Sequence, residues 1–102
     1  MFIVLYRWRI KTGLEAQFKE NWSAITRYYV ENCGSLGSRL HHGTDGIYYS
    51  YAQWPSSLAR ENAILDVQLE LARLHMKETI EEYLPEVILE VVDDHLKPPP
   101  AE

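Results

Sequence analysis

The N-terminal segment Phe2–Arg9 constrains the fold more than any other part of this sequence. It is β-branched and aromatic, contains no helix-breaking residue and precedes a turn signal at Thr12-Gly13, so it predicts a strand. Side chains alternate across a strand, which separates the set Phe2, Val4, Tyr6 and Trp8 from the set Ile3, Leu5, Arg7 and Arg9. Both sets are apolar over at least half of their length, and a strand of this kind is covered on both faces.

The next segment predicts an amphipathic helix. Thr12-Gly-Leu-Glu15 has the pattern of a capping box, so the helix is expected to begin at Thr12. Apolar residues then recur with the spacing of one helical stripe: Leu14, Phe18, Trp22, Ile25 and Tyr29. Asn32-Cys33-Gly34 supplies the residue that ends the helix.

Two extended segments follow, Leu36–His42 and Gly46–Trp54, and Gly43-Thr-Asp-Gly46 joins them. An Asp-Gly pair between β-rich segments predicts an antiparallel hairpin. After the hydroxyl caps at Ser56 and Ser57, a second helical region is expected from about Leu58 to Tyr83. Its later part carries the apolar stripe Leu69, Ala72, Met76, Ile80 and Tyr83.

Asp66 is expected to break or re-cap this helical region. After Pro85, alternating apolar residues predict a last strand over Glu86–Val92. The order β-α-β-β-α-β is typical of the α+β ferredoxin-like fold, a single antiparallel sheet with helices on one face. We expect one such domain over residues 1–96 and a Pro-rich, extended tail over residues 97–102.

The predicted layout leaves one apolar sheet face without a helix to cover it. A second copy of the chain is the economical cover, so we expect a homodimer packed through its sheet faces. Arg7 on the first strand is expected to form an ion pair with Glu90 on the last strand, which is its neighbour in this fold.

Charge and cysteine content exclude several classes of protein. Ten Lys and Arg against fifteen Asp and Glu leave a net charge of −5, which argues against nucleic acid or an anionic membrane as a partner. The apolar run Met1–Tyr6 is too short for a signal peptide or a membrane span. The single Cys33 is expected to be an inert thiol in a reducing cytoplasm. His41 and His42 point to opposite faces of a strand, so no metal site is expected.

The segments Phe2–Arg9, Lys11–Gly13, Gly34–Gly37 and Tyr51–Ser56, in this order around an aromatic helix, resemble the antibiotic biosynthesis monooxygenase family. The resemblance implies a dimeric α/β barrel with a pocket between the sheet and the helices of each subunit. It also implies a scaffold used for cofactor-free oxygenation of phenolic and quinol-like substrates. Other members of the family degrade haem or have no established activity.

The sequence departs from the family pattern at its functional positions. Histidines that members often carry in the second helical region correspond here to positions near Ala63 and Gln68. In haem-degrading relatives an asparagine stands near the position of Tyr6, and His75 supplies their histidine only with a shift of about two residues. Haem degradation is therefore disfavoured, and no cofactor is expected, because the chain has neither a glycine-rich phosphate loop nor a ligand cluster.

The candidate site residues each have a second interpretation. Tyr6, Trp8 and Trp22 are candidates for an aromatic slot that binds a flat substrate, or else they are core residues. His75 is the candidate general base and Tyr6 the residue that holds the resulting oxyanion, although a histidine on a helix flank is commonly just solvated. Arg73 is a candidate for binding an anionic oxygen, or is simply exposed.

Three hypotheses for the function follow. The first is a small homodimeric enzyme that oxygenates an electron-rich aromatic molecule without a cofactor, because a phenolate donates an electron directly to dioxygen. The second is a module that binds a small hydrophobic ligand without chemistry, for example in a stress response. The third is a structural domain selected for dimerisation. The missing histidines near Ala63 and Gln68 count against the first hypothesis and leave the other two unaffected.

Overall fold

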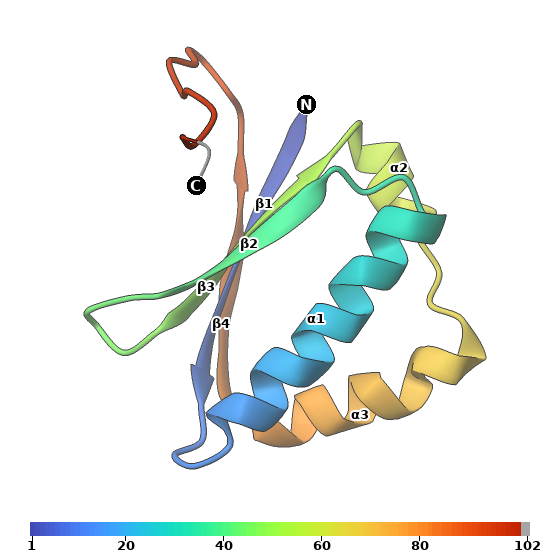
Figure 1. The fold of residues 1–102 in the computed structure, drawn as a ribbon, viewed down its shortest axis with the longest axis vertical. Helices are drawn as coiled ribbons and strands as arrows, with labels where there is room; N and C mark the ends of the chain where they lie inside the picture. Colours follow the sequence, from blue (N-terminus) through green and yellow to red (C-terminus); the bar gives the residue numbers. More distant parts are fainter. Residues whose placement is uncertain (101–102) are drawn as a thin grey trace.

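Strand β1 (Phe2–Ile10) lies inside a four-stranded antiparallel sheet with the strand order β2-β3-β1-β4. In the computed structural model, which describes residues 1–100, β1 pairs with β3 (Tyr48–Trp54) on one side and β4 (Ile80–Leu89) on the other. Strand β2 (Gly37–His42) forms the expected antiparallel hairpin with β3. The predicted α+β, ferredoxin-like order of elements is confirmed (Figure 1).

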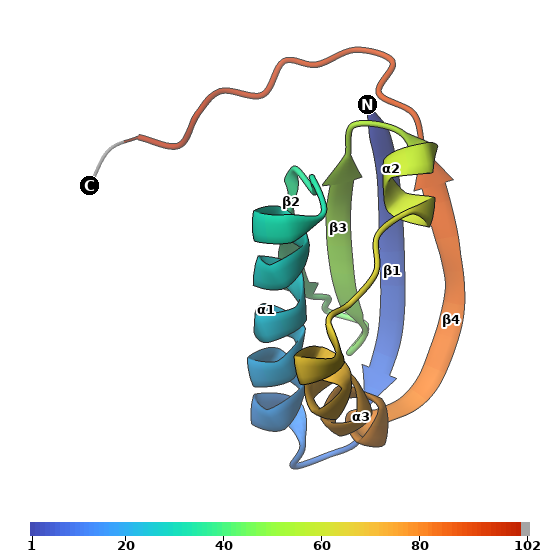
Figure 2. The ribbon, with the colours of Figure 1, turned by 90° about the vertical axis from the view of Figure 1, so that its right-hand side faces the viewer.

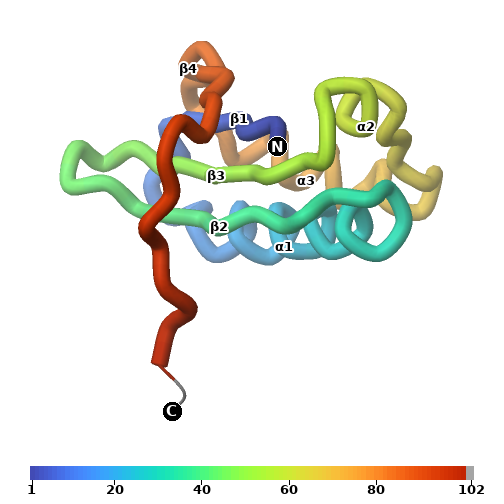
Figure 3. Tube along the Cα trace, turned by 90° about the horizontal axis from the view of Figure 1, so that it is seen from above, coloured from blue at the N-terminus to red at the C-terminus, as the bar shows by residue number. Residues whose placement is uncertain are grey.

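The helices all lie on the same face of the sheet (Figures 1 and 2). The long helix α1 (Glu15–Asn32) runs along the sheet and packs against α3 (Glu70–Thr79). The short helix α2 (Ser57–Glu61) and the 3-10 turn η1 (Val67–Leu69) precede α3 in the chain. Figure 3 shows the tip of the β2–β3 hairpin extending beyond this helical layer.

The core lies between α1 and the sheet. Phe18, from the predicted helical stripe, is fully buried, and its ring centre lies 5.3 Å from that of Trp8 and 5.4 Å from that of Tyr48. Ile80, at the start of β4, completes the buried cluster, and Tyr6 packs against it. The β1 set that contains Tyr6 and Trp8 therefore faces the helices, which the sequence left open.

Helix α1 begins later than the capping-box pattern predicted. Its cap residue is Leu14, and no side chain caps the helix. The Leu14 backbone N–H donates to the Lys11 carbonyl oxygen over 3.0 Å, and Gly13 lies in the left-handed region with φ of +89°. The prediction that the helix begins at Thr12 was wrong, because Thr12 and Gly13 form the turn that reverses the chain after β1. At the other end of α1, Gly34 adopts the left-handed conformation expected of the residue that ends the helix, with φ of +75°.

The second helical region is broken where Asp66 predicted. The Asp66 side chain accepts a hydrogen bond from the Gln68 backbone N–H and begins η1, while the Ser56 hydroxyl caps α2 by accepting from the Ala59 N–H. The region ends at Thr79, however, and not near Tyr83. Residues 80–83 continue the helical spacing, yet they belong to β4, because Ile10 and Trp8 of β1 pair there with Ile80 and Tyr83.

Strand β4 therefore includes Pro85 instead of starting after it. Proline has no backbone N–H, and it is tolerated on an edge strand or at a bulge. Pro85 has both conditions, because β4 is at the edge of the sheet and the pairing shifts between Leu5–Val87 and Arg7–Leu84. The strand ends at Leu89, so Val91 and Val92 lie outside it.

The sheet face opposite the helices is a mixture of apolar and charged residues. Alternation and register place on it Ile3, Leu5, Arg7 and Arg9 from β1, Tyr49, Tyr51 and Gln53 from β3, and Val87 and Leu89 from β4. Val87 and Leu89 are 38% and 37% exposed. We call the neighbouring residues Leu5, Tyr51, Val87 and Leu89 the open-face patch.

The expected Arg7–Glu90 ion pair does not form. The Arg7 guanidinium donates instead to the Pro85 carbonyl oxygen, over 3.1 Å from Nε and 2.7 Å from Nη2. Glu90 lies beyond the end of β4, and Glu82 provides the cross-strand carboxylate for Arg9, with 2.9 Å between Nε and Oε1. The alternation predicted the right face for Arg7, but the earlier start of β4 changes its neighbours.

Residues 90–100 carry neither helix nor strand and leave the end of β4 as an extended segment (Figure 2). The last two positions of the predicted tail, 101 and 102, lie outside the described residues. None of the helices described in residues 1–100 combines the length and the apolar character that a membrane crossing requires.

Candidate functional site

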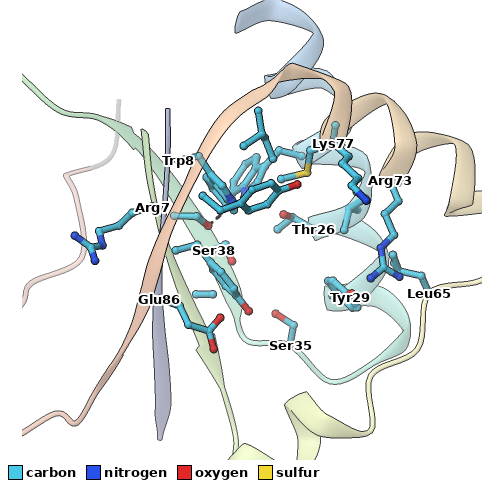
Figure 4. A pocket seen from close by; sticks show the side chains of 18 of the residues that line it. Arg7, Trp8, Thr26, Tyr29, Ser35, Ser38, Leu65, Arg73, Lys77 and Glu86 are labelled. Carbon is cyan, nitrogen blue, oxygen red and sulfur yellow. Dashed lines mark hydrogen bonds between the residues drawn. The ribbon is translucent and has the colours of Figure 1, made fainter. Parts of the chain in front are cut away.

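An open cavity of about 620 Å³ lies between the helix-facing side of the sheet and helices α1 and α3. Side chains from β1, β3, β4 and both helices form its wall, as Figure 4 shows for most of them. Its apolar and aromatic wall residues include Tyr6, Trp8, Trp22, Ile25, Tyr29, Trp54, Met76, Ile80 and Tyr83. A cavity of this size and lining is typical of a site for a small organic molecule.

Two aromatic side chains of β1 form one wall. Tyr6 and Trp8 stand on the same face of the strand, and their rings are parallel with centroids 5.7 Å apart. Trp8 is 8% exposed and is also part of the core. It is therefore both a wall residue of the cavity and a core residue, the two interpretations that the sequence offered for it. Flat π faces of this kind favour stacking with a flat aromatic ligand.

Trp22 extends the aromatic lining from α1. Its indole Nε1–H donates to the Ser50 Oγ over 3.2 Å, and Ser50 is 1% exposed. An indole N–H removed from water needs a partner, and for the partly buried Trp22 that partner comes from β3. The hydrogen bond therefore orients the Trp22 ring in the cavity wall, and Ser50 was not predicted by the sequence because nothing in its neighbourhood marks it.

Tyr6 lies beside a pair of opposite charges. The Arg60 guanidinium carbon, from α2, is 5.5 Å from the centre of the Tyr6 ring. Arg60 Nη2 also donates to both carboxylate oxygens of Glu86 on β4, over 2.9 and 2.8 Å. This ion pair connects α2 to the edge of the sheet across Tyr6. Glu86 itself lines the cavity.

Burial raises the pKa of Tyr6 above its ordinary value of 10.0, although the Arg60 charge opposes this shift. The pKa of Tyr29, on α1, is shifted in the same direction: burial raises it and the charge of Arg73 opposes the rise. Both phenols are therefore protonated at neutral pH and available as hydrogen-bond donors to an oxygen atom of a ligand.

Replacing Tyr6 with Phe should reduce the loss of stability above pH 10. The raised folded-state pKa means that the folded protein holds the proton more tightly than the unfolded chain. Stability from this group is complete below the unfolded pKa and is lost as pH rises through the folded pKa. Free energies of unfolding, measured in urea from neutral pH to above pH 10, should fall less steeply for the variant. Identical slopes would contradict the assignment.

His75 is not on the cavity wall. The wall residues of α3 are Arg73, Met76 and Lys77, and Ile80, the first residue of β4, follows them. Their spacing of three, one and three positions defines one helix face, and a helix turns about 100° per residue, so position 75 lies off that face. The His75 backbone oxygen accepts from Gln17 Nε2 on α1 over 3.0 Å. Our expectation that His75 borders the pocket was therefore wrong.

The other predicted residues come together. Tyr6, Trp8, Trp22 and Arg73 all line the cavity, although their roles remain predictions. Lys77 and Glu86 also line it and were not singled out. Lys77 had a signal in the sequence, since it stands four positions after Arg73 on a helix. Glu86 had none, because its place depends on the bulge at Pro85.

Metal-binding side chains do not gather in the described part of the chain. Over residues 1–100, no group of three His, Cys, Asp or Glu side chains has a metal-binding arrangement. His41 Nδ1 is 3.3 Å from the Tyr49 carbonyl oxygen, and the His42 ring stacks on Tyr48 with centroids 4.6 Å apart.

No protein-family model matches the sequence, and no curated protein matches it by sequence. Solved structures do match the fold. A variant of SnoaB, a cofactor-independent oxygenase from Streptomyces nogalater, aligns with a TM-score of 0.75 and 12% identity over 94% of this chain and 97% of its own. An antibiotic biosynthesis monooxygenase aligns with a TM-score of 0.73 and 13% identity over 91% of this chain and 100% of its own.

Rv0793 from Mycobacterium tuberculosis aligns with a TM-score of 0.73 and 14% identity, over 93% of this chain and 98% of its own. At these identities the likeness shows the fold. The chain has the ferredoxin-like fold of the antibiotic biosynthesis monooxygenases, as its sequence resemblance implied.

Proposed function

We propose that this chain is a dimeric monooxygenase of the antibiotic biosynthesis type, which oxygenates a flat, electron-rich aromatic molecule without a cofactor. The observation that carries the proposal is the cavity of about 620 Å³ with the stacked Tyr6 and Trp8 rings on one wall and Trp22 on another. The shared fold with a cofactor-independent oxygenase supports it.

Oxygenation of this kind makes few demands on the protein. A phenol or quinol loses a proton to a base, and the resulting anion gives one electron to dioxygen. The two radicals combine to a peroxide anion, which takes the proton back from the base and becomes a hydroperoxide. Loss of water from the hydroperoxide leaves a carbonyl group, so that an anthrone and dioxygen yield an anthraquinone and water. The protein needs an apolar cavity, a proton acceptor and a donor that stabilises the oxyanion.

In this proposal Tyr6 donates its phenolic hydrogen to the substrate oxyanion, and Glu86 accepts the substrate proton. Glu86 carries the one carboxylate among the described wall residues, and none of those residues is a histidine. Glu86 therefore replaces His75 as the candidate base. Trp8 and Trp22 hold the ring system, and their bulk excludes water from the reacting carbon.

Replacing Glu86 with Gln should lower kcat by roughly two to four orders of magnitude, the usual contribution of a general base. The assay follows oxygen consumption with a panel of quinols and anthrones. Glu82→Gln is the matched control, because Glu82 is on the same strand but binds Arg9. His75→Ala should leave kcat within about twofold, as expected for a side chain away from the cavity.

The Arg60→Gln variant separates chemistry from positioning. It breaks the link between α2 and β4 and keeps the Glu86 carboxylate. A large loss in Glu86→Gln with a small one in Arg60→Gln supports proton transfer to Glu86. Equal losses in both would show that the ion pair only holds the wall in place, and unchanged rates in Glu86→Gln would refute the base assignment.

A second candidate function is ligand binding without turnover. It is favoured by the double hydrogen bond from Arg60 to Glu86, which occupies the oxygens that would accept a proton. Saturable quenching of tryptophan fluorescence by the quinols and anthrones, with no oxygen consumption, would establish this function in place of catalysis. A reducing compartment such as the cytoplasm suits either function, because the one cysteine, Cys33, is a free thiol.

The homodimer belongs to the same proposal. The open-face patch of Leu5, Tyr51, Val87 and Leu89 lies on the sheet face that carries no helix. Two such faces packed together would remove these apolar side chains from water.

A further inference from the structure

The cavity-facing side of α3 has two different parts. Met76 contributes apolar surface, and so does Ile80, which directly follows the helix and is part of the buried core. Arg73 and Lys77 stand one helical turn apart on the same face, and both line the cavity. The α3 side of an otherwise aromatic cavity therefore carries two positive charges.

The other arginines near the cavity, Arg7 and Arg60, already have partners, and so does Arg9 on β1. Arg9 binds Glu82, Arg60 binds Glu86, and Arg7 is held by the Pro85 carbonyl oxygen. Within residues 1–100, neither Arg73 nor Lys77 takes part in an ion pair or a side-chain hydrogen bond. Their charges remain available to a ligand.

The cations also lie apart from the acidic wall residue. Figure 4 shows Arg73 and Lys77 together on one side of the cavity, near Tyr29 and Thr26, and Glu86 on the other side. Arg60 already compensates the charge of Glu86. Arg7 is also a wall residue, but its guanidinium points away from the cavity toward the Pro85 carbonyl oxygen (Figure 4). The positive charges that remain for a ligand are thus at the α3 end, while the protein as a whole has a net charge of −5.

We infer that the ligand of this cavity is an aromatic acid, whose carboxylate binds Arg73 and Lys77 while its ring system stacks against Tyr6 and Trp8. The inference rests on the proposed function in so far as the cavity must take up an aromatic molecule. A guanidinium binds a carboxylate through two parallel hydrogen bonds, and a nearby ammonium adds a point charge. The Thr26 and Tyr29 hydroxyls are the neighbouring donors.

A matched pair of fluorescent probes tests this inference. The anion 8-anilinonaphthalene-1-sulfonate and the neutral N-phenyl-1-naphthylamine have the same aromatic body and differ by one acidic group. Wild-type protein should bind the anionic probe about tenfold or more tightly than the neutral probe, at one site per chain. Raising the salt concentration should weaken binding of the anionic probe alone.

The double variant Arg73→Gln, Lys77→Gln should lose about tenfold in affinity for the anionic probe and less than about twofold for the neutral one. The double variant Lys19→Gln, Arg27→Gln on α1 is the control. Both residues are exposed and lie outside the cavity, and the two substitutions remove the same amount of positive charge. Circular dichroism of both variants should match wild type.

The outcomes separate the inference from the function beneath it. Equal affinity of wild type for the two probes, or equal losses in the α1 and α3 variants, overturns the aromatic acid and leaves an aromatic cavity. Binding of neither probe overturns the proposed aromatic site itself. Selective loss of the anionic probe in the α3 variant supports the inference, and competition by 1-hydroxy-2-naphthoate but not by 1-naphthol would extend it to carboxylates.

Discussion

Phe18→Ala should destabilise the protein by about 3–5 kcal/mol, the usual cost of removing a fully buried aromatic ring from a core. Phe18 is 0% exposed, and its ring contacts Trp8 and Tyr48 edge to face. The substitution leaves a void between α1 and the sheet that the surrounding elements fill only in part. A loss of this size is a large fraction of the roughly 5–15 kcal/mol that stabilises an ordinary domain.

Urea unfolding followed by tryptophan fluorescence measures this effect. Val30→Ala is the matched control on the same helix, because Val30 is 46% exposed and should cost less than about 1 kcal/mol. A loss below about 1 kcal/mol for Phe18→Ala would show that the ring is not part of a tightly packed core.

Leu5→Asp should abolish the proposed dimer. Leu5 lies in the open-face patch, between Tyr51 on β3 and Val87 on β4. In a dimer packed through this face, the introduced carboxylate would be buried without a partner, at a cost of several kcal/mol. Sedimentation equilibrium at micromolar concentration should give about twice the chain mass of 11.9 kDa for wild type and the single chain mass for the variant.

Val87→Asp is the second variant of this test, because Val87 is already 38% exposed in the single chain and its replacement is expected to leave the fold intact. Leu58→Asp on α2 is the control on the helical side, where the side chain is 61% exposed. A wild-type monomer at micromolar concentration would refute the dimer. Dimers in both open-face variants would place the interface elsewhere on the molecule.

The sequence predicted the main elements because their signals are local. The β-branched segment at the N-terminus, the Asp45-Gly46 turn and the helical stripe through Phe18 each specify their own conformation within a few residues. The same holds for the break at Asp66, whose side chain caps the next turn directly. The candidates for an aromatic wall, Tyr6, Trp8 and Trp22, followed from these elements, although the face of β1 that meets the helices did not.

The errors lie where a distant partner decides the conformation. Residues 80–83 fit a helical period, but pairing with β1, some 70 positions earlier in the chain, draws them into β4. Thr12 fits a capping box, but the turn out of β1 takes precedence. His75 was placed at the pocket because it flanks the apolar stripe of Leu69, Ala72 and Met76. The packing of α3 against the sheet turns the opposite flank, with Arg73 and Lys77, toward the cavity.

The sequence by itself determined the order of elements and the need to cover β1 on both faces, because burial of alternating apolar side chains is a property of each strand alone. Only the tertiary structure decided that Tyr6 and Trp8 face the helices, that Arg60 and Glu86 meet across Tyr6, and that two free cations stand at one end of the cavity. Those features depend on the register and bulge of β4 against β1. Register is set by the summed pairing and packing of whole strands, which no local pattern contains.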